Sequence, residues 1–335
     1  MDVHQRGDLR LPQSLPEFQR LFPNDAACAT YLEKARWSDG FVCPHCQAAG
    51  EPFRFANRPG VLRCRKCRHD AGLTVGTVMA RSHTPLSVWF GAAYLVSSQT
   101  PGMSAVQLQR QLGLSRYETA FQILHKLRAG MVRPDQDRIG GRPGEHVEAD
   151  ETWVGGRTRG KGRGVHDNKV LVASAVEVRQ RKPGTKLDKR KGGRYAGRVR
   201  LAIVPDRSAE SLCGFVECAV VPGTSLVTDD WSGYASLAKR GYKHLAIAER
   251  GDPQVTEQYL PIIHLVFANL KTWLNGTHHG GQSPAPPSLP QRIHLPLQQA
   301  VLSVQRLPFP ARHRGGCHRT NLRRALLWSM AAPYM

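Results

Sequence analysis

The sequence predicts an α/β (α+β) chain in which a mixed sheet with flanking helices follows a small cysteine-rich domain and a helical region. Three observations support this prediction. Two Cys-x-x-Cys pairs lie near the N-terminus. Helical periodicity follows between residues 84 and 130. Beyond residue 145, short apolar and β-branched segments alternate with helical ones, as is typical of an α/β domain.

The composition favours a polyanionic partner. The chain has 335 residues and a formal net charge of +21, although only 22% of its residues are charged. Such an excess of Lys and Arg is most simply explained by nucleic acid binding, and the alternative is a basic enzyme without such a partner. The chain has no apolar run of the roughly 18 residues that a membrane span needs, so we expect no membrane partner. The N-terminus also lacks the apolar core of a signal peptide.

Residues 1–83 are expected to form two short helices and a ribbon. Residues 14–22 and 24–34 carry amphipathic patterns, and Asn24 or Asp25 is suited to cap the second helix. The segments Phe53-Arg-Phe and Val61-Leu-Arg would be the strands of the ribbon.

Four cysteines in this part have the spacing of a metal site. Cys43-Pro-His-Cys46 is followed 17 residues later by Cys64-Arg-Lys-Cys67. Two such turns can place four thiolates tetrahedrally around Zn²⁺, and paired knuckles suit metal in a reducing compartment better than disulfides. Because so small a ribbon cannot fold on its apolar core alone, zinc should contribute to its stability.

Residues 84–140 are predicted to be helical, with a helix-turn-helix. Residues 85–98 are apolar along most of their length, which indicates a buried helix. Ser104 would cap a short helix, Gly113 to Ser115 make the turn, and residues 116–127 form a second helix. The same pattern also occurs in ordinary helical hairpins. Residues 133–144 resemble a linker.

Basic and polar side chains in both of these parts are candidates for DNA contact. Those of the second cysteine turn could bind phosphates, and the alternative for them is a solvated basic turn. Those of the second helix of the helix-turn-helix could face a groove. The candidates are Arg65, Lys66, Arg116, Gln122 and Lys126.

Two predicted strands in residues 145–280 carry carboxylates. Residues 146–155 form one strand, with Asp150 in its middle, where burial of a carboxylate is costly unless it is paired or binds a metal. Residues 225–229 form another strand that ends in Asp229 and Asp230. Bringing such carboxylates together is how proteins build a Mg²⁺ site for phosphoryl transfer. Glu151 should point to the opposite face of its strand from Asp150.

The other elements complete a sheet with helices around it. Strands are expected at 169–178, 199–204 and 244–248, and helices at 209–218, 232–239 and 261–276. The order β-β-β-α-β-α-β-α is the ribonuclease H-like layout, a mixed sheet with flanking helices. Two segments are rich in Arg and Lys. Residues 157–163 would be a loop, and residues 179–200 would be either a solvated hairpin tip or a DNA clamp.

Three blocks of this part resemble the motifs of a known family. They are Glu-Ala-Asp-Glu-Thr-Trp-Val-Gly-Gly from residue 148, Val-Thr-Asp-Asp-Trp-Ser-Gly-Tyr from 227, and His-Leu-Val-Phe-Ala-Asn-Leu-Lys-Thr-Trp-Leu-Asn-Gly-Thr-His-His-Gly from 264. The chain resembles bacterial insertion-sequence transposases of the DDE type with an N-terminal zinc ribbon, from about Leu15 to Gly280.

The resemblance implies a reaction and two of its residues. With Mg²⁺ or Mn²⁺ as cofactor, water would nick the transposon ends and the freed 3′-hydroxyl would attack target DNA. Asp150 and Asp229 would be the metal-binding carboxylates. Asp230 stands where many relatives carry Gly, so we treat it as secondary.

The third catalytic position departs from the Glu of many relatives. In those, a Lys follows the Glu by seven residues, and counting back from Lys271 gives His264. Asn269 is the other candidate, because relatives that lack Glu are often described by an Asn. On a helix, His264 and Lys271 share a face from which Asn269 turns away, so we favour His264. Lys271 would steady a phosphate.

Residues 281–335 do not fit the family, whose relatives continue with a segment like Val-Ser-Pro and a helix containing Phe-Arg-Phe-Asn-Arg-Arg. Codons that encode Gly281-Gln-Ser-Pro-Ala-Pro-Pro and Leu295-Pro-Leu-Gln-Gln-Ala-Val-Leu can yield those two segments when read one base later. We therefore hypothesise a frameshift near Gly280 or Gly281, and the alternative is a genuine disordered basic tail.

The sequence thus predicts a transposase that binds insertion-sequence ends and performs metal-dependent strand cleavage and transfer, with activity impaired if the frame has shifted. The alternative is a non-catalytic, transposase-derived DNA-binding protein such as a repressor. By resemblance we expect double-stranded DNA partners (terminal repeats and target), a homodimer on DNA, and a bacterial, cytoplasmic, nucleoid-associated location.

Overall fold

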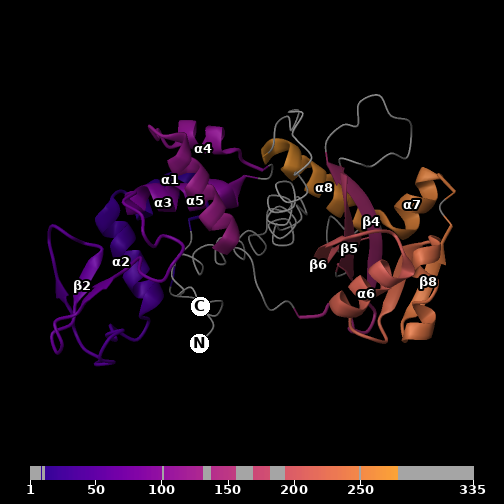
Figure 1. Cartoon of the computed structure of the whole chain (residues 1–335), viewed down its shortest axis with the longest axis horizontal. Coiled ribbons are helices and arrows are strands. Elements are labelled where there is room, and N and C mark those ends of the chain that lie inside the picture. Colours follow the sequence, from indigo (N-terminus) through magenta and orange to yellow (C-terminus); the bar gives the residue numbers. More distant parts are fainter. Residues whose placement is uncertain are drawn as a thin grey trace. The chain divides into compact units, whose positions relative to one another are not determined.

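A computed structural model describes residues 9, 12–99, 102–130, 137–155, 169–181, 193–248 and 250–277. The described residues form two compact units, one that ends at residue 130 and one that begins at residue 137 (Figure 1). The predicted loop at 157–163 and the tail at 281–335 lie outside the described residues. Within the described ranges, no helix combines the length and apolar character needed to cross a membrane.

The N-terminal unit begins with the two predicted helices, α1 (Leu15–Leu21) and α2 (Asp25–Arg36). The side chain of Asn24 accepts a hydrogen bond from the N–H of Ala27 at 3.0 Å, so Asn24 rather than Asp25 caps α2. Arg36 at the end of α2 donates to the carbonyls of Leu73 and Val75 at 2.7 and 2.8 Å. This contact ties the ribbon to α2.

The ribbon is a three-stranded antiparallel sheet of β1 (Phe53–Arg54), β2 (Val61–Arg63) and β3 (Asp70–Gly72). The first two strands lie where the sequence predicts them. The third was not predicted, because Asp-Ala-Gly has little intrinsic strand preference. It pairs with β2 through the register Leu62 to Ala71, and both of these residues are buried.

The helical region comprises α3 (Leu86–Ser98), α4 (Ala105–Gln111) and α5 (Tyr117–Gly130). The side chain of Ser104 accepts from the N–H of Gln107 at 3.2 Å, which confirms the predicted cap of α4. Gly113 has a φ of 62° and makes the turn between α4 and α5. The two helices and the glycine turn between them thus lie where the sequence predicts them.

The C-terminal unit is built on a five-stranded mixed sheet with the order β6-β5-β4-β7-β8. Antiparallel β4 (His146–Gly155), β5 (Lys169–Gln180) and β6 (Arg194–Val204) form the predicted meander. The strands β7 (Ser225–Asp229) and β8 (Lys243–Ile247) continue the sheet in parallel with β4. The predicted ribonuclease H-like mixed sheet with flanking helices is thus confirmed.

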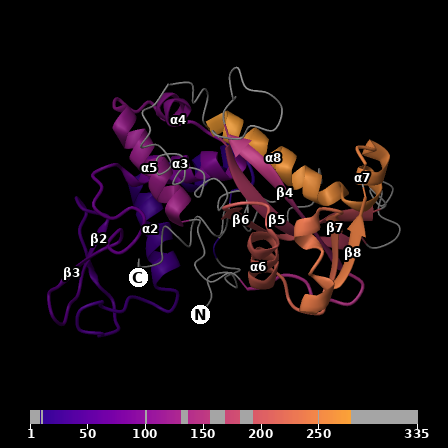
Figure 2. The same cartoon turned by 45° about the vertical axis from the view of Figure 1, so that its right-hand side comes forward.

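Helices cover both faces of this sheet (Figure 2). The long helix α8 (Pro261–Thr277) packs on one face, and its buried residues include Ile263, Val266, Phe267 and Leu270. The helix α6 (Ala209–Ala219) packs on the other face. A short helix, α7 (Pro253–Tyr259), precedes α8 and was not predicted. Because both faces are covered, the central strands are buried on both sides.

Two predictions for this unit were wrong. The segment at 232–239 is not one helix but two 3₁₀ turns, η3 (Ser232–Tyr234) and η4 (Ala238–Arg240). Its buried residues Tyr234 and Leu237 are three apart, which matches the 3₁₀ period of three. The predicted basic hairpin tip at 179–200 is also shorter, because residues 194–200 already belong to β6. Its remaining part, 182–192, lies outside the described residues.

Candidate metal centres and DNA-contact residues

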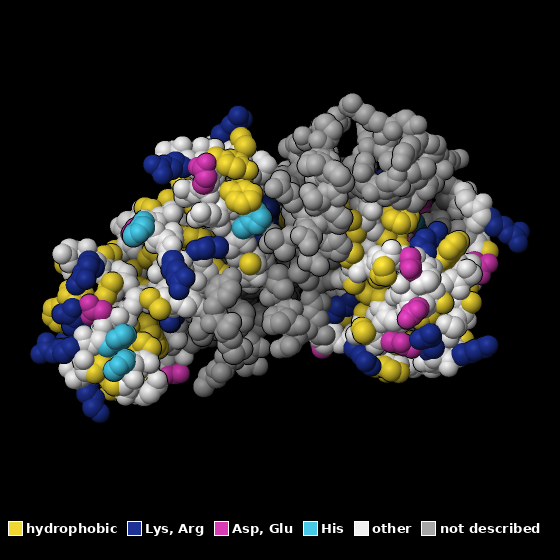
Figure 3. All heavy atoms as spheres, viewed as in Figure 1, with side chains coloured by type: hydrophobic (Ala, Val, Ile, Leu, Met, Phe, Trp, Pro, Cys, Tyr) yellow, Lys and Arg dark blue, Asp and Glu magenta, His cyan; other side chains and the backbone are white. Residues whose placement is uncertain are grey.

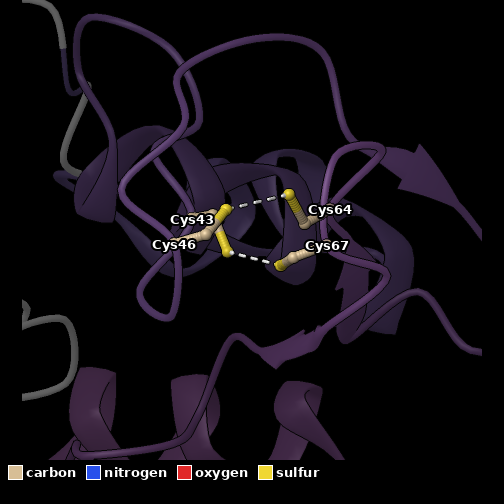
Figure 4. A group of neighbouring side chains, drawn as sticks. All are labelled: Cys43, Cys46, Cys64 and Cys67. Carbon is tan, nitrogen blue, oxygen red and sulfur yellow. Dashed lines mark hydrogen bonds between the residues drawn. The ribbon is translucent and has the colours of Figure 1, made fainter.

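The four predicted cysteines come together from two similar turns (Figure 4). In each turn, the residue after the second cysteine has a positive φ, 57° at Gln47 and 61° at Arg68. The N–H of each of these residues donates to the carbonyl of the first cysteine of its turn, at 2.9 and 3.0 Å. The two turns therefore present their thiols in the same manner from opposite sides.

The spacing of the sulfurs suits zinc. Sγ of Cys43 lies 3.7 Å from that of Cys67, and Cys46 is equally far from Cys64. All four sulfurs lie within 4.8 Å of one another. A regular tetrahedron with a 3.7 Å edge has its centre about 2.3 Å from each corner, which is the usual Zn–S distance. These cysteines are suited to hold a structural Zn²⁺.

The negative charge of cysteine thiolates at this site also favours a bound cation. Hydrogen bonds from the backbone N–H groups of Cys67 and Lys66 lower the pKa of the Cys64 thiol to about 6. The N–H of His69 acts likewise on Cys67, but burial and the neighbouring sulfurs raise the pKa of Cys67 to about 12. Four sulfurs this close cannot all be thiolates without a positive charge between them. His45 and His69 stack on each other at 5.1 Å and are not part of the sulfur group.

The second centre begins with Asp150 and Asp229 on neighbouring parallel strands. β4 pairs with β7 at Val147–Leu226 and Glu148–Val227. Asp150 and Asp229 each stand two residues further along, so both point to the face covered by α8. Their side chains are 13% and 26% exposed. The sheet register thus brings the two predicted carboxylates side by side.

Glu151 joins them, although it points to the other face of β4 as expected. One carboxylate oxygen from each of Asp150, Glu151 and Asp229 lies within 4.8 Å of the others. This is possible because β7 ends at Asp229, so side chains from both faces of β4 can reach the space beyond it. The sequence analysis placed Glu151 on the opposite face of the strand and so did not predict that its carboxylate lies close to those of the two aspartates.

Arg207 and Tyr234 hold Glu151 in place, and sequence reasoning missed both. Arg207 Nε donates to Glu151 Oε1 at 2.5 Å, and Tyr234 Oη donates to Oε2 at 2.7 Å. Burial and the charge of Glu151 raise the pKa of Tyr234 well above its usual value, so Tyr234 remains a neutral donor. The Arg207 guanidinium also lies 3.8 Å from the centre of the Trp231 ring and 4.0 Å from Asp229 Oδ2.

This arrangement is suited to a divalent cation. Three carboxylates within 4.8 Å repel one another unless cations neutralise them. Arg207 supplies one positive charge at the edge of the group. Carboxylate oxygens are the ligands that Mg²⁺ and Mn²⁺ prefer. The acidic group therefore fits a catalytic Mg²⁺ or Mn²⁺.

The third position is approached from α8. His264 Nε2 lies 3.9 Å from Asp150 Oδ2, and the His264 side chain is 43% exposed. Lys271 is exposed two helical turns further on, on the same side of α8, and Asn269 is half-buried and turned away from that side. Of the two candidates for the third position, the structure therefore brings His264 beside Asp150, although His264 is not itself a member of the group of three carboxylates.

The DNA-contact candidates differ in their exposure. Arg65 and Lys66 are exposed on the second cysteine turn, although Arg65 Nε also donates to the Glu51 carbonyl at 3.1 Å. Arg116 and Gln122 are exposed at and near the start of α5.

Lys126 is the exception, because it is half-buried. Its Nζ donates to the Ala80 carbonyl at 2.7 Å and lies 5.9 Å from the Trp89 ring centre. These contacts favour a structural role for Lys126 over one at a DNA surface.

In Figure 3, Lys and Arg side chains outnumber acidic ones on the visible face of the N-terminal unit.

Comparisons with known families agree with both centres. Residues 23–70, which include all four cysteines, match the transposase zinc-ribbon domain. Residues 142–284, which include Asp150, Asp229 and His264, match the ISXO2-like transposase domain. The chain therefore carries a region that matches a transposase zinc ribbon, followed by one that matches an ISXO2-like transposase domain.

A protein from Halobacterium salinarum, named as an uncharacterized protein in transposable element ISH50, is 25% identical over 146 residues. The alignment covers 43% of this chain and 47% of that protein, so the chain spans about half the length of the curated relative it matches. No solved structure matches the chain.

Proposed function

We propose that this chain, which carries a transposase zinc ribbon and an ISXO2-like transposase domain, is an insertion-sequence transposase that cuts and joins DNA strands. The observation that carries the proposal is the meeting of Asp150 and Asp229 from adjacent parallel strands, with His264 above them. Cutting by water would leave a 3′-hydroxyl on the transposon strand. Its oxygen would then attack a phosphorus atom of the target strand, form a new phosphodiester bond and displace the 3′-oxygen of the adjacent target nucleotide, which takes up a proton.

The residues of the site have separate tasks in this proposal. Asp150 and Asp229 would hold Mg²⁺ or Mn²⁺, which when bound supplies Lewis acid chemistry at the scissile phosphate. Glu151, held by Arg207 and Tyr234, adds negative charge beside them. The His264 imidazole fills the third position, where it can bind the cation or move a proton.

Two further polar residues of α8 have different places in the proposed site. The Lys271 ammonium, on the same side of the helix as His264, can contact a DNA phosphate. Asn269 is half-buried and would support the helix rather than the reaction. His264 and Lys271 together thus take the place of the Glu and Lys of relatives.

The N-terminal unit would bind the transposon ends. Arg65 and Lys66 on the zinc ribbon can contact phosphates, and Arg116 and Gln122 on α5 can face a groove. Because joining requires two transposon ends at once, we propose that two copies of the chain act on paired terminal repeats. Replacing the three basic residues of this set by Ala should weaken end binding and make its affinity less dependent on salt concentration, because fewer counterions are then released from the DNA.

We further propose that the reading frame changes near Gly280. A chain shifted there lacks the arginine-containing C-terminal helix of its relatives, which would impair activity. The competing function is that of a non-catalytic DNA-binding protein that occupies the same ends.

The test is a cleavage and strand-transfer assay on labelled DNA that carries the element's ends. It compares this chain with a version whose frame is restored, each with Mg²⁺, Mn²⁺ or a chelator. In the version that cleaves, Asp150→Ala and Asp229→Ala should each lower the rate by at least roughly a thousandfold, whereas Asp230→Ala, an exposed neighbour, should change it by less than about threefold. If neither version cuts but both bind the ends, the chain is a DNA-binding protein and the catalytic proposal fails.

A further inference from the structure

Glu148 is a fully buried carboxylate that the proposed reaction does not use. Its side chain is 0% exposed. Oε2 accepts hydrogen bonds from the N–H groups of Ile262 and Ile263 at 2.9 and 2.7 Å. These two residues lie in the first turn of α8, 114 and 115 residues further along the chain. Glu148 therefore links the central strand β4 directly to the start of α8.

The start of α8 depends on this distant acceptor. The first N–H groups of a helix have no partner within the helix. The residue before α8 is Leu260, whose side chain cannot accept a hydrogen bond, and Pro261 has no N–H to donate. The other helices that show a side-chain cap use the residue just before them: Ser14, Asn24, Ser104, Ser208 and Asp252.

The helix in turn holds the buried side chain. Two of the N–H groups that have no partner within α8 both donate to the same oxygen, Oε2 of Glu148. A local serine or aspartate would satisfy the same N–H groups without joining α8 to β4. A glutamate on the strand therefore ties the start of α8 to β4. This link helps to set the position of α8 along the sheet and its rotation about its own axis.

This link acts at the catalytic residues. Asp150 follows Glu148 by two residues on the same face of β4, and His264 follows Ile263 directly on α8. His264 Nε2 and Asp150 Oδ2 are 3.9 Å apart. We propose that Glu148 is a positioning residue, which holds α8 so that His264 stands beside Asp150. Its importance for the reaction rests on the proposed function, whereas its hold on α8 does not.

Two variants separate hydrogen bonding from packing. Glu148→Gln keeps an oxygen that can accept the two N–H bonds. Glu148→Met keeps the length of the side chain but has no comparable acceptor. Glu177→Gln is the matched control, because Glu177 is also fully buried but accepts from Gly140 and Arg198 rather than from α8. Should Glu148→Met not fold, Glu148→Asp replaces it, since Asp withdraws the carboxylate by one methylene.

The first measurement is hydrogen exchange of the full chain by mass spectrometry. In Glu148→Met, exchange in peptides from the start of α8 should accelerate by about tenfold or more, as expected for loss of a helix cap. Glu148→Gln should stay within about threefold of the wild type, and Glu177→Gln should leave these peptides unchanged. Equal protection of the start of α8 in the wild type and in Glu148→Met would overturn the proposal.

The second measurement is the rate of end cleavage in whichever version of the chain cleaves. Glu148→Met should lower kcat by at least about tenfold with an unchanged KM for DNA, and Glu148→Gln should restore most of it. A normal kcat in a variant whose α8 has loosened would overturn the positioning role. If no version cleaves DNA, the proposed function fails, and the exchange comparison alone still decides whether Glu148 holds α8.

Discussion

Removal of zinc is the perturbation whose effect the structure defines most closely. The two sulfur pairs at 3.7 Å match the sulfur–sulfur distance around a tetrahedral zinc ion with Zn–S bonds of about 2.3 Å. One zinc per chain with four sulfurs at this distance is therefore expected in X-ray absorption spectra. No nitrogen ligand is expected, because His45 and His69 stack on each other away from the sulfur group.

The ribbon cannot replace the contribution of this metal. Its buried apolar side chains are few, namely Phe41, Leu62, Ala71 and Leu73. At roughly 2 kcal/mol for each large one, they supply less than the free energy on the order of 10 kcal/mol that structural zinc contributes to small domains. Without zinc, the thiolates also repel one another. The region between residues 41 and 73 should therefore unfold while the sheet of the C-terminal unit persists.

The assay is hydrogen exchange of the full chain before and after treatment with a strong chelator, alongside zinc analysis. Protection should be lost across the ribbon, return when zinc is added back, and stay unchanged in β4 and β5. Cys64→Ser should bind far less zinc, whereas His45→Ala and His69→Ala should keep it. A ribbon that remains protected after complete zinc removal, or a nitrogen atom in the first coordination shell, would refute this reasoning.

Three further predictions concern the C-terminal unit and its gene. Burial alone would raise the pKa of Glu177, but hydrogen bonds from Arg198 and from the Gly140 N–H lower it from 4.5 to about 2. Because the folded-state pKa is depressed, this carboxylate contributes about 3 kcal/mol above pH 4.5, which is lost as the pH falls towards 2. The difference in unfolding free energy between wild type and Glu177→Gln, measured in urea, should therefore shrink with acid; a constant difference would contradict the assignment. Arg207→Ala removes a positive charge 4.0 Å from Asp229 and should therefore tighten Mn²⁺ binding about tenfold, as measured by calorimetry. The control Arg240→Ala breaks an ion pair with Glu217 elsewhere and should leave Mn²⁺ binding unchanged. Weaker Mn²⁺ binding in Arg207→Ala would argue against this electrostatic account. Finally, the gene read one base later from about codon 281 should encode Phe-Arg-Phe-Asn-Arg-Arg, and a gene that cannot do so would show the tail to be genuine.

Local patterns predict the zinc ribbon and the sheet well, for physical reasons. Each Cys-x-x-Cys turn is a local feature of four residues, and the separation of the two turns lets both bind one metal ion, so the site can be predicted without knowing the rest of the fold. The strand β5 is long, apolar and rich in valine, and β4 alternates apolar with polar residues in its first half, and both patterns are typical of strands. The closeness of Asp150 and Asp229 also follows from the sequence, once the strand order places both strands side by side.

Features that depend on tertiary contacts were not predicted. The turns η3 and η4 are one example. A Cβ atom added at Gly233 would lie only 2.7 Å from the Arg207 carbonyl oxygen, so the chain at η3 runs close to a distant segment, and local spacing cannot predict this. Lys126 has the sequence context of a DNA-facing residue, and only the fold places the Ala80 carbonyl within its reach. The closeness of Glu151 to the aspartates likewise requires knowing where β7 ends.

The proposed third catalytic position shows how sequence pattern and tertiary structure combine. The apolar stripe of α8, which includes Ile263, Val266 and Leu270, can be read from the sequence, and it leaves His264 and Lys271 on the opposite, exposed side. The stripe alone does not say how far along the sheet α8 lies, so it cannot place His264 over Asp150 rather than one turn away. A shift of one helical turn would move the imidazole by about 5.4 Å, which is more than its present separation from Asp150. The two hydrogen bonds to Glu148 join the start of α8 to the strand that carries Asp150, so in our proposal this strand residue helps to decide which side chain of α8 stands beside Asp150.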